Sequence, residues 1–367
     1  MTKDPDVVID FIPDYCNNCG VKLDVPYEFV DRKQEVELPP IQPQYIEYRS
    51  YSRTCTCCGH HTISHLPECL KVPIQFGPNI KTLVAYLSVV HYLPYQRMTK
   101  LFKDVFHLSI SGGSIDNIIG RMALSGEPFY QIIKKETHQS KVVGGDETGI
   151  HINGKKAWFN VWQTPRLTFI APSLKRDYKT IEDLFPDGLT NSVLVSDCWA
   201  SQLKTPAANH QLCTVHLLRE LNNFIDAFGC QWSVDMKQLF KEALEQKKKM
   251  MPADYLYPNE KVKAIENKLD ELLKVDLATK HKKLQAFIKR LLKNRSYILN
   301  FLYYEKVPPD NNTSEQAIRN AKVKMKVSGQ FRNPVGAKRF SILRSIIDTA
   351  NKNSKNIFEA LSILANS

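Results

Sequence analysis

The sequence has no apolar run long enough to cross a membrane, because none approaches the roughly 20 residues that a spanning helix needs. Its first residues, Met1 to Asp6, also lack the basic and then apolar profile of a secretion signal. These two absences argue against membrane and secreted proteins, and we expect a protein of a bacterial-type cytoplasm or of a nucleus.

Acidic residues are the minority charge, with 38 Asp and Glu against 50 Lys and Arg, for a formal net charge of +12. A surplus of this size favours a polyanionic partner such as nucleic acid. With 367 residues, of which 43% are hydrophobic, the chain is long enough for two or three globular domains with their own cores.

Nine cysteines without a secretion signal indicate metal binding or buried thiols rather than disulfides. Four of them form two pairs, Cys16-Asn-Asn-Cys19-Gly20 and Cys55-Thr-Cys-Cys58-Gly59. Each CxxC places two thiolates on a tight knuckle, and the glycine that follows permits the turn. Two such knuckles can complete a tetrahedral Zn²⁺ site. The alternatives are reduced buried cysteines or a redox CxxC, and Cys57 could replace Cys58 only with poorer spacing.

Strand-like stretches at 27–38 and 45–51 lie between the knuckles, separated by a proline-rich turn. This layout is typical of a zinc ribbon, which we assign to residues 1–75. The neighbouring His60, His61, His65 and Cys69 fit loop positions better than ligand positions. A ribbon with all four ligand positions filled is a binding module or scaffold rather than a catalyst.

Residues 76–138 show helical periodicity. Residues 108–121 read as a Gly/Ser turn followed by a helix that is capped near Ser111 or Ser114. A short helix, a turn and a second helix suggest a helix-turn-helix that binds DNA. The second helix has few basic residues beyond Arg121, so a helical linker without DNA contacts is the alternative.

From residue 139 the period becomes that of strands, which we expect at 141–143, 156–163, 167–171 and 192–197, with a helix at 178–185. Three strands joined by short turns, a helical crossover and another strand describe an α/β mixed sheet of the ribonuclease H type over 139–367. Helices follow, including an amphipathic insertion at about 232–305. Its lysine runs at 247–249 and 280–283 are typical of solvated faces.

Three carboxylates stand at special places in this scheme. Asp146 and Asp197 follow the first and fourth strands, which are neighbours in a ribonuclease H type sheet. Glu315 lies in the first turn of a helix that Asn311, Asn312 or Thr313 can cap. Three carboxylates suit hard divalent cations, and two such ions about 4 Å apart can promote phosphodiester chemistry.

Each carboxylate also has an ordinary structural interpretation. Asp146 could form a turn, Asp197 could cap a helix, and Glu315 could serve only the helix dipole. Glu147 is a rival ligand, but neighbouring strand residues point to opposite faces, which favours Asp146.

The strings that carry these acids are Gly145-Asp-Glu-Thr148, Ser196-Asp-Cys-Trp-Ala200 and Asp310-Asn-Asn-Thr-Ser-Glu-Gln-Ala-Ile-Arg319. They resemble the three catalytic blocks of the IS66-family transposases, which belong to the DDE group with a ribonuclease H-like core. The CxxC pairs resemble the zinc-binding domain of that family. The resemblance covers nearly the whole chain.

The resemblance implies a DDE transposase with Asp146, Asp197 and Glu315 as its catalytic, Mg²⁺-binding triad, with Mn²⁺ as a possible substitute. Zn²⁺ would be structural, on Cys16, Cys19, Cys55 and Cys58. The reaction implied is cleavage at transposon ends, followed by attack of the freed 3′-hydroxyl on target DNA. The expected partners are DNA, further copies of the chain on DNA and accessory proteins of the same element, in a bacterial cytoplasm at the nucleoid.

Two further groups of residues are singled out. Cys213-Thr-Val-His216 is similar to a (C/D)xxH element of several DDE groups, which would place His216 close to the active site. The alternative is a zinc site of His210, Cys213 and His216, but it would lack a clear fourth ligand. Basic residues in and after the Glu315 helix are expected to contact DNA: Arg319, Lys322, Lys326, Arg332, Lys338 and Arg339. Arg319 could instead pair with Glu315, one turn before it.

Two other functions compete with this one. The first is a non-catalytic DNA-binding or assembly protein derived from a transposable element, and the second is a nuclease on the same fold that cuts without joining.

Overall fold

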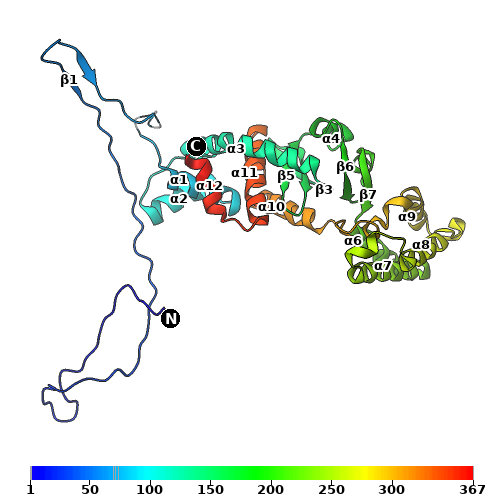
Figure 1. Cartoon of the computed structure of the whole chain (residues 1–367), viewed down its shortest axis with the longest axis horizontal. Helices are drawn as coiled ribbons and strands as arrows, with labels where there is room; N and C mark the ends of the chain where they lie inside the picture. Colours follow the sequence, from blue (N-terminus) through cyan, green and yellow to red (C-terminus); the bar gives the residue numbers. More distant parts are fainter. Residues whose placement is uncertain (1, 69, 71, 73, 367) are drawn as a thin grey trace.

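The computed structural model describes residues 2–68, 70, 72 and 74–366. The molecule is elongated, with a central sheet, helices on either side of it along the long axis and an N-terminal segment that extends away (Figure 1). None of the helices within the described residues is long and apolar enough to cross a membrane.

The sheet has five strands: β3 (Val142–Ile152), β4 (Lys155–Gln163), β5 (Thr168–Ser173), β6 (Leu189–Ser196) and β7 (Ala207–Leu212). Their order is β5-β4-β3-β6-β7. The pairs β3–β4 and β4–β5 are antiparallel, whereas β6 is parallel to β3 and β7 is parallel to β6. This confirms the expected mixed α/β sheet of the ribonuclease H type.

Two features of the sheet differ from the sequence prediction. β3 does not end before Asp146 but continues to Ile152, where Asn153 and Gly154 (φ 49° and 73°) turn the chain into β4. β7 was not predicted, because its residues include polar ones such as Gln211. That side chain is buried and satisfied, since it donates to the Ile298 carbonyl (2.9 Å) and accepts from the Phe301 amide (2.8 Å).

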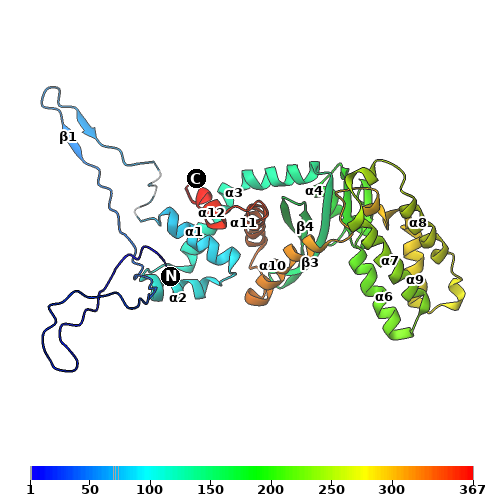
Figure 2. The same cartoon turned by 60° about the horizontal axis from the view of Figure 1, so that its bottom comes forward.

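The two faces and one edge of the sheet are covered by different helices. A Cβ on Gly145 would meet Trp162 and Leu194, on the face where α3 (Gly112–Gln139) and α4 (Tyr178–Leu184) pack. α10 (Asn312–Ser328) lies on the opposite face (Figure 2). α11 (Pro334–Lys352) covers the edge strand β5, because Ser345 and Thr349 accept hydrogen bonds from its amides.

The helical region before the sheet contains α1 (Pro78–Ala85), a π-helical turn (Tyr86–Val90), α2 (Tyr95–Phe106) and the start of α3. The C-terminal α12 (Ile357–Asn366) packs on α1. The helical region therefore combines residues that precede the sheet with the last helix of the chain. The predicted pair of helices with an intervening turn is present as α2 and α3. However, α3 runs on for 28 residues into the core, where the Tyr130 hydroxyl donates to the Ile170 carbonyl. α3 ends at Gln139, next to the boundary expected at residue 138, but its second half packs on the sheet.

The helix α6 (Thr214–Phe228) follows β7. The insertion expected at about 232–305 is helical, with α7 (Gln231–Lys249), α8 (Glu260–Leu273), α9 (Lys282–Lys293) and short 3-10 turns at Pro252–Tyr255, Leu277–Thr279, Arg295–Tyr297 and Asn300–Leu302. All four helices have the amphipathic pattern of a packed helical unit. They form a second hydrophobic core that reaches the sheet through Val193, Val195 and Leu212. The lysine run at 247–249 was expected to be solvated, but this is wrong for Lys247. Its ammonium group donates to three backbone carbonyls, including that of Phe301 (2.6 Å).

The N-terminal segment has the two knuckles but not the expected strands. In each knuckle the glycine amide donates to the first cysteine carbonyl, Gly20 to Cys16 and Gly59 to Cys55, both at 2.9 Å and with φ near 70°. A hairpin of β1 (Ser52–Thr54) and β2 (His61–Ile63) surrounds the second knuckle. The stretches at 27–38 and 45–51 form no strand, and their apolar side chains, such as Phe29, are exposed. Cys69 lies outside the described residues.

Candidate active site

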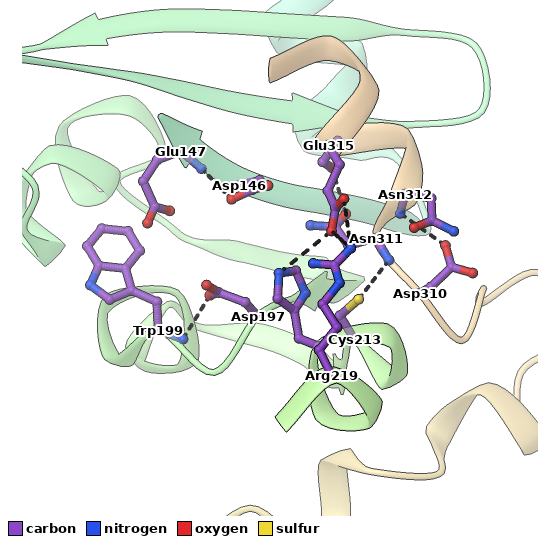
Figure 3. A network of polar contacts seen from close by, with 12 residues as sticks. Asp146, Glu147, Asp197, Trp199, Cys213, Arg219, Asp310, Asn311, Asn312 and Glu315 are labelled. Atoms are coloured by element: carbon purple, nitrogen blue, oxygen red, sulfur yellow. Dashed lines mark hydrogen bonds and ion pairs between the residues drawn. The ribbon is translucent and has the colours of Figure 1, made fainter. Parts of the chain in front are cut away.

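Asp146 and Asp197 lie side by side because of the register between β3 and β6. The parallel pairs are Val142 with Val193, Val143 with Leu194 and Gly144 with Val195. The same register carried two residues further places Asp146 opposite Asp197, where β6 has just ended. Asp146 is thus not at the end of its strand, as the sequence suggested, but at the point where β3 loses its pairing with β6. Figure 3 shows the two side chains on neighbouring elements.

The Asp146 carboxylate has no cationic partner among the described residues. Its Oδ1 accepts one hydrogen bond, from the backbone amide of Glu147 (2.8 Å). Burial, together with the charges of Glu147, Asp197 and Glu315, raises the pKa of Asp146 to about 7, although the hydrogen bond from that amide acts in the opposite direction. A carboxyl group in this setting is stabilised in its ionised form only when a cation joins it.

The Asp197 carboxylate accepts a hydrogen bond from the Trp199 amide at 2.9 Å, just before the short helix α5 (Ala200–Lys204). The N-cap of α5 is Trp199, so the capping interpretation of Asp197 is wrong, and the Asp197 carboxylate instead makes this local turn contact with the Trp199 amide. That contact uses Oδ1 and leaves Oδ2 available to a ligand.

Glu315 lies in the first turn of α10 and faces α6. Its carboxylate is 3.6 Å from His216 Nε2 and is contacted by Arg219 Nη2 at 3.2 and 3.3 Å. His216 is therefore close to the acidic cluster, as the family resemblance implied. The arginine that pairs with Glu315 is Arg219, from α6, and not Arg319, which is exposed on α10.

Asn311 fixes α10 to the sheet at this point. Its side-chain amide donates to the Gly145 carbonyl (2.7 Å), its Oδ1 accepts from the Ser314 hydroxyl (2.6 Å), and its backbone amide donates to Cys213 Sγ (3.2 Å). A Cβ on Gly144 would lie 2.6 Å from Asn311 Oδ1, so this contact needs glycine at 144. Gly144 and Asp146 share a face of β3, and α10 consequently brings Glu315 to the face of Asp146.

Glu147 is engaged elsewhere. Its side chain is 2% exposed, forms an ion pair with Arg176 and accepts from Gln202 Nε2 at 3.0 Å. The Arg176 guanidinium lies over the rings of Trp158 and Trp199, 5.1 and 4.7 Å from their centroids. These partners satisfy Glu147 and leave Asp146 as the available carboxylate of the pair.

The possible zinc set of His210, Cys213 and His216 is not assembled. His210 packs against the Tyr297 ring, Cys213 accepts from Asn311, and His216 faces Glu315. More generally, no three His, Cys, Asp or Glu side chains within the described residues are arranged to hold a metal ion. The chemistry of the acidic cluster nevertheless fits Mg²⁺, because its donors are carboxylate oxygens and no cation among the described residues pairs with Asp146.

The cysteines of the knuckles have the chemistry of zinc ligands. Backbone amides lower the pKa of Cys16 (from Asn18 and Cys19) and of Cys55 (from Cys58 and Cys57), which favours the thiolates that bind Zn²⁺. The two knuckles are apart in this structure, since Figures 1 and 2 show the β1–β2 hairpin and the first loop of the chain extending in different directions.

The six expected DNA contacts fall into two groups. Arg319, Lys322, Lys326 and Arg332 are exposed, and the first three follow one another at helical spacing along α10 from Glu315. Lys338 and Arg339 instead join α11 to α3. Lys338 lies 3.6 Å from Glu127 and over the Tyr130 ring, and Arg339 lies 3.0 Å from Asp116.

Sequence reasoning missed Arg219, Arg176 and the structural role of Asn311. Arg219 follows His216 by three residues, which is one turn of α6, so the spacing Cys213-x-x-His216-x-x-Arg219 contained a signal for it. The partners of Arg176 and Asn311 come from distant segments, and no local pattern indicates them.

A five-stranded mixed sheet with one acidic residue on a strand, a second directly after the adjacent strand and a third on a packed helix defines a protein of the ribonuclease H-like class. The chain belongs to the IS66 family of transposases: the model described as "Transposase IS66 family" matches residues 73–339. The model for the zinc-finger binding domain of transposase IS66 matches residues 13–59. A search of curated proteins gave no match. Family membership makes the protein a transposase that acts on DNA, with a zinc-binding domain ahead of its core.

Proposed function

We propose that the chain cleaves DNA at the ends of its transposon and joins the freed 3′-hydroxyls to target DNA, with Asp146, Asp197 and Glu315 as the catalytic residues. The observation that carries the proposal is the register that sets Asp146 beside Asp197, under a helix that presents Glu315 to the same face. An Asp146 carboxylate without a cationic partner supports a cation site there.

The three carboxylates would hold two Mg²⁺ ions, or Mn²⁺ in their place. When bound, such ions neutralise charge on the scissile phosphate and favour the attacking and leaving oxygens. The residues of this chain orient the ligands: the Trp199 amide donates to Asp197, and His216 lies beside Glu315. Asn311 keeps α10, and with it Glu315, at a fixed position against β3.

The rest of the chain would place DNA at this site. We assign residues 1–75 to a zinc-ribbon domain with one structural Zn²⁺ on Cys16, Cys19, Cys55 and Cys58, 76–138 to a helical DNA-binding region and 139–367 to the catalytic domain. Its helical insertion spans about 232–305. Arg319, Lys322 and Lys326 would follow the DNA backbone away from Glu315, together with Arg332. Lys338 and Arg339 are already paired within the protein and are left out of this surface.

Two transposon ends must be processed together, so we expect several copies of the chain to assemble on DNA, with accessory proteins of the same element. The test uses a labelled duplex that carries a transposon end, incubated with the full chain and Mg²⁺ or Mn²⁺. D146A, D197A and E315A should each abolish cleavage and retain binding in a gel-shift assay. Full cleavage by D197A would refute the proposed site.

The products separate this function from its competitors. A transposase yields end fragments joined to target DNA, whereas a nuclease on the same fold yields only cut ends. Binding with steep salt dependence but without cutting in either metal would instead identify a DNA-binding protein.

A further inference from the structure

Arg219 is the one cation that contacts the acidic cluster through Glu315 among the described residues, apart from a protonated His216. It projects from α6, on the turn after His216, and Figure 3 shows its side chain reaching toward Glu315. Its side chain is 55% exposed, whereas that of Glu315 is 21% exposed. The guanidinium thus lies at the mouth of the cluster, with one side toward Glu315 and the other toward solvent.

The contact with Glu315 uses only part of the arginine. Both distances, 3.2 and 3.3 Å, come from the single atom Nη2. The N–H groups of Nη1 and Nε have no acceptor within the described part of the chain. An ion pair this exposed adds little to the stability of the fold. The structure therefore gives Arg219 little purpose as a structural residue and leaves several donors available at the site.

We propose that Arg219 binds a DNA phosphate at the cleavage site and that it exchanges Glu315 for this phosphate when DNA arrives. This inference rests on the proposed function, since it assigns a substrate contact within the same site. A planar guanidinium matches the geometry of a phosphate as well as that of a carboxylate. The carboxylates of Glu147, Asp197 and Glu315 surround Asp146, so a phosphate that enters this cluster needs a cation from the protein beside it.

The exchange gives Arg219 opposite effects in the two states of the protein. Without DNA, its charge on Glu315 opposes the binding of a divalent cation to the same carboxylate. With DNA bound, the phosphate takes over the guanidinium, and Glu315 becomes available to the metal. Removal of the arginine charge should therefore favour metal binding to the free protein and weaken the reaction on DNA.

The test compares the full-length wild type with R219Q, and with K241Q as a control. Lys241 is an exposed lysine of the insertion helix α7, so K241Q makes the same change in net charge far from the site. Three quantities are measured: Mn²⁺ affinity of the DNA-free protein by electron paramagnetic resonance, the salt dependence of end binding, and the cleavage rate at saturating Mg²⁺.

R219Q is expected to bind Mn²⁺ several-fold more tightly than the wild type. The slope of log K against log salt should be shallower by about one, because one phosphate contact is lost. Cleavage should be roughly a hundredfold slower, as when a single charge-stabilising donor is removed from an active site. R219K, which keeps the charge without the fork, should retain the salt slope and recover part of the rate. K241Q should match the wild type in all three measurements.

A salt slope and a cleavage rate at wild-type values in R219Q would overturn the phosphate contact. Unchanged or weaker Mn²⁺ binding would overturn the exchange with Glu315. Cleavage by D197A distinguishes a failure of this inference from a failure of the proposed function. If D197A is inactive and R219Q behaves as the wild type, only the role of Arg219 is wrong; if D197A still cleaves DNA, the proposed function itself is wrong.

Discussion

The side-chain amide of Asn311 donates to the backbone carbonyl of Gly145 at 2.7 Å. Gly145 directly precedes Asp146 on β3, and Asn311 directly precedes α10, which carries Glu315 in its first turn. One buried hydrogen bond thus connects the strand that carries Asp146 with the start of the helix that carries Glu315, although these two proposed metal ligands are far apart in the sequence. It sets how closely the helix approaches the strand.

N311A removes this bond and leaves the Gly145 carbonyl and the Ser314 hydroxyl without their partner. We expect the free energy of unfolding to fall by about 1–3 kcal/mol, as when buried polar groups lose a partner. Cleavage should fall further than end binding, because Glu315 loses its fixed position. Urea unfolding and cleavage assays measure the two effects. N312A is the matched control, since Asn312 is exposed, and equal losses in both variants would refute this role for Asn311.

G144A tests the closeness of α10 to β3 directly. The new methyl group would lie 2.6 Å from Asn311 Oδ1 and 2.8 Å from Ser314 Oγ, so α10 would have to move. Such overpacking should cost about 1–3 kcal/mol and slow cleavage. G149A, on the same strand, places its methyl group 3.7 Å from the Trp158 side chain, in ordinary contact, and should be close to the wild type. Thermal unfolding of both variants checks this, and a G144A protein as stable as G149A would contradict it.

Zinc content tests the N-terminal module. C16S and C58S should each lower bound zinc from one ion per chain, measured by elemental analysis, and a chelator should do the same to the wild type. The N-terminal segment should then become more sensitive to proteolysis, because metal binding and folding are coupled in such modules. C57S is the control, since the CxxC spacing assigns Cys58 rather than Cys57 as the ligand. Loss of zinc in C57S with retention in C58S would reverse that assignment.

Local patterns were sufficient for much of this molecule. The CxxC-Gly spacing predicted both knuckle turns, and apolar runs predicted the strands that place Asp146 and Asp197 together. Patterns failed where a buried polar side chain has its hydrogen-bond partners in a distant segment. β7 was missed for this reason, because the side chain of Gln211 is buried on it and bonds to the backbone of Ile298 and Phe301. For the same reason the partner of Glu315 was sought on its own helix, at Arg319, whereas it comes from α6.

The most direct test of the central claim, that Asp197 is a metal ligand, replaces it with a thiol. A cysteine ligand binds Mg²⁺ poorly and binds softer ions such as Mn²⁺ better. We predict that D197C is inactive on the labelled transposon end in Mg²⁺ and regains cleavage in Mn²⁺, while D197A stays inactive in both. Wild-type cleavage by D197C in Mg²⁺ would contradict the account.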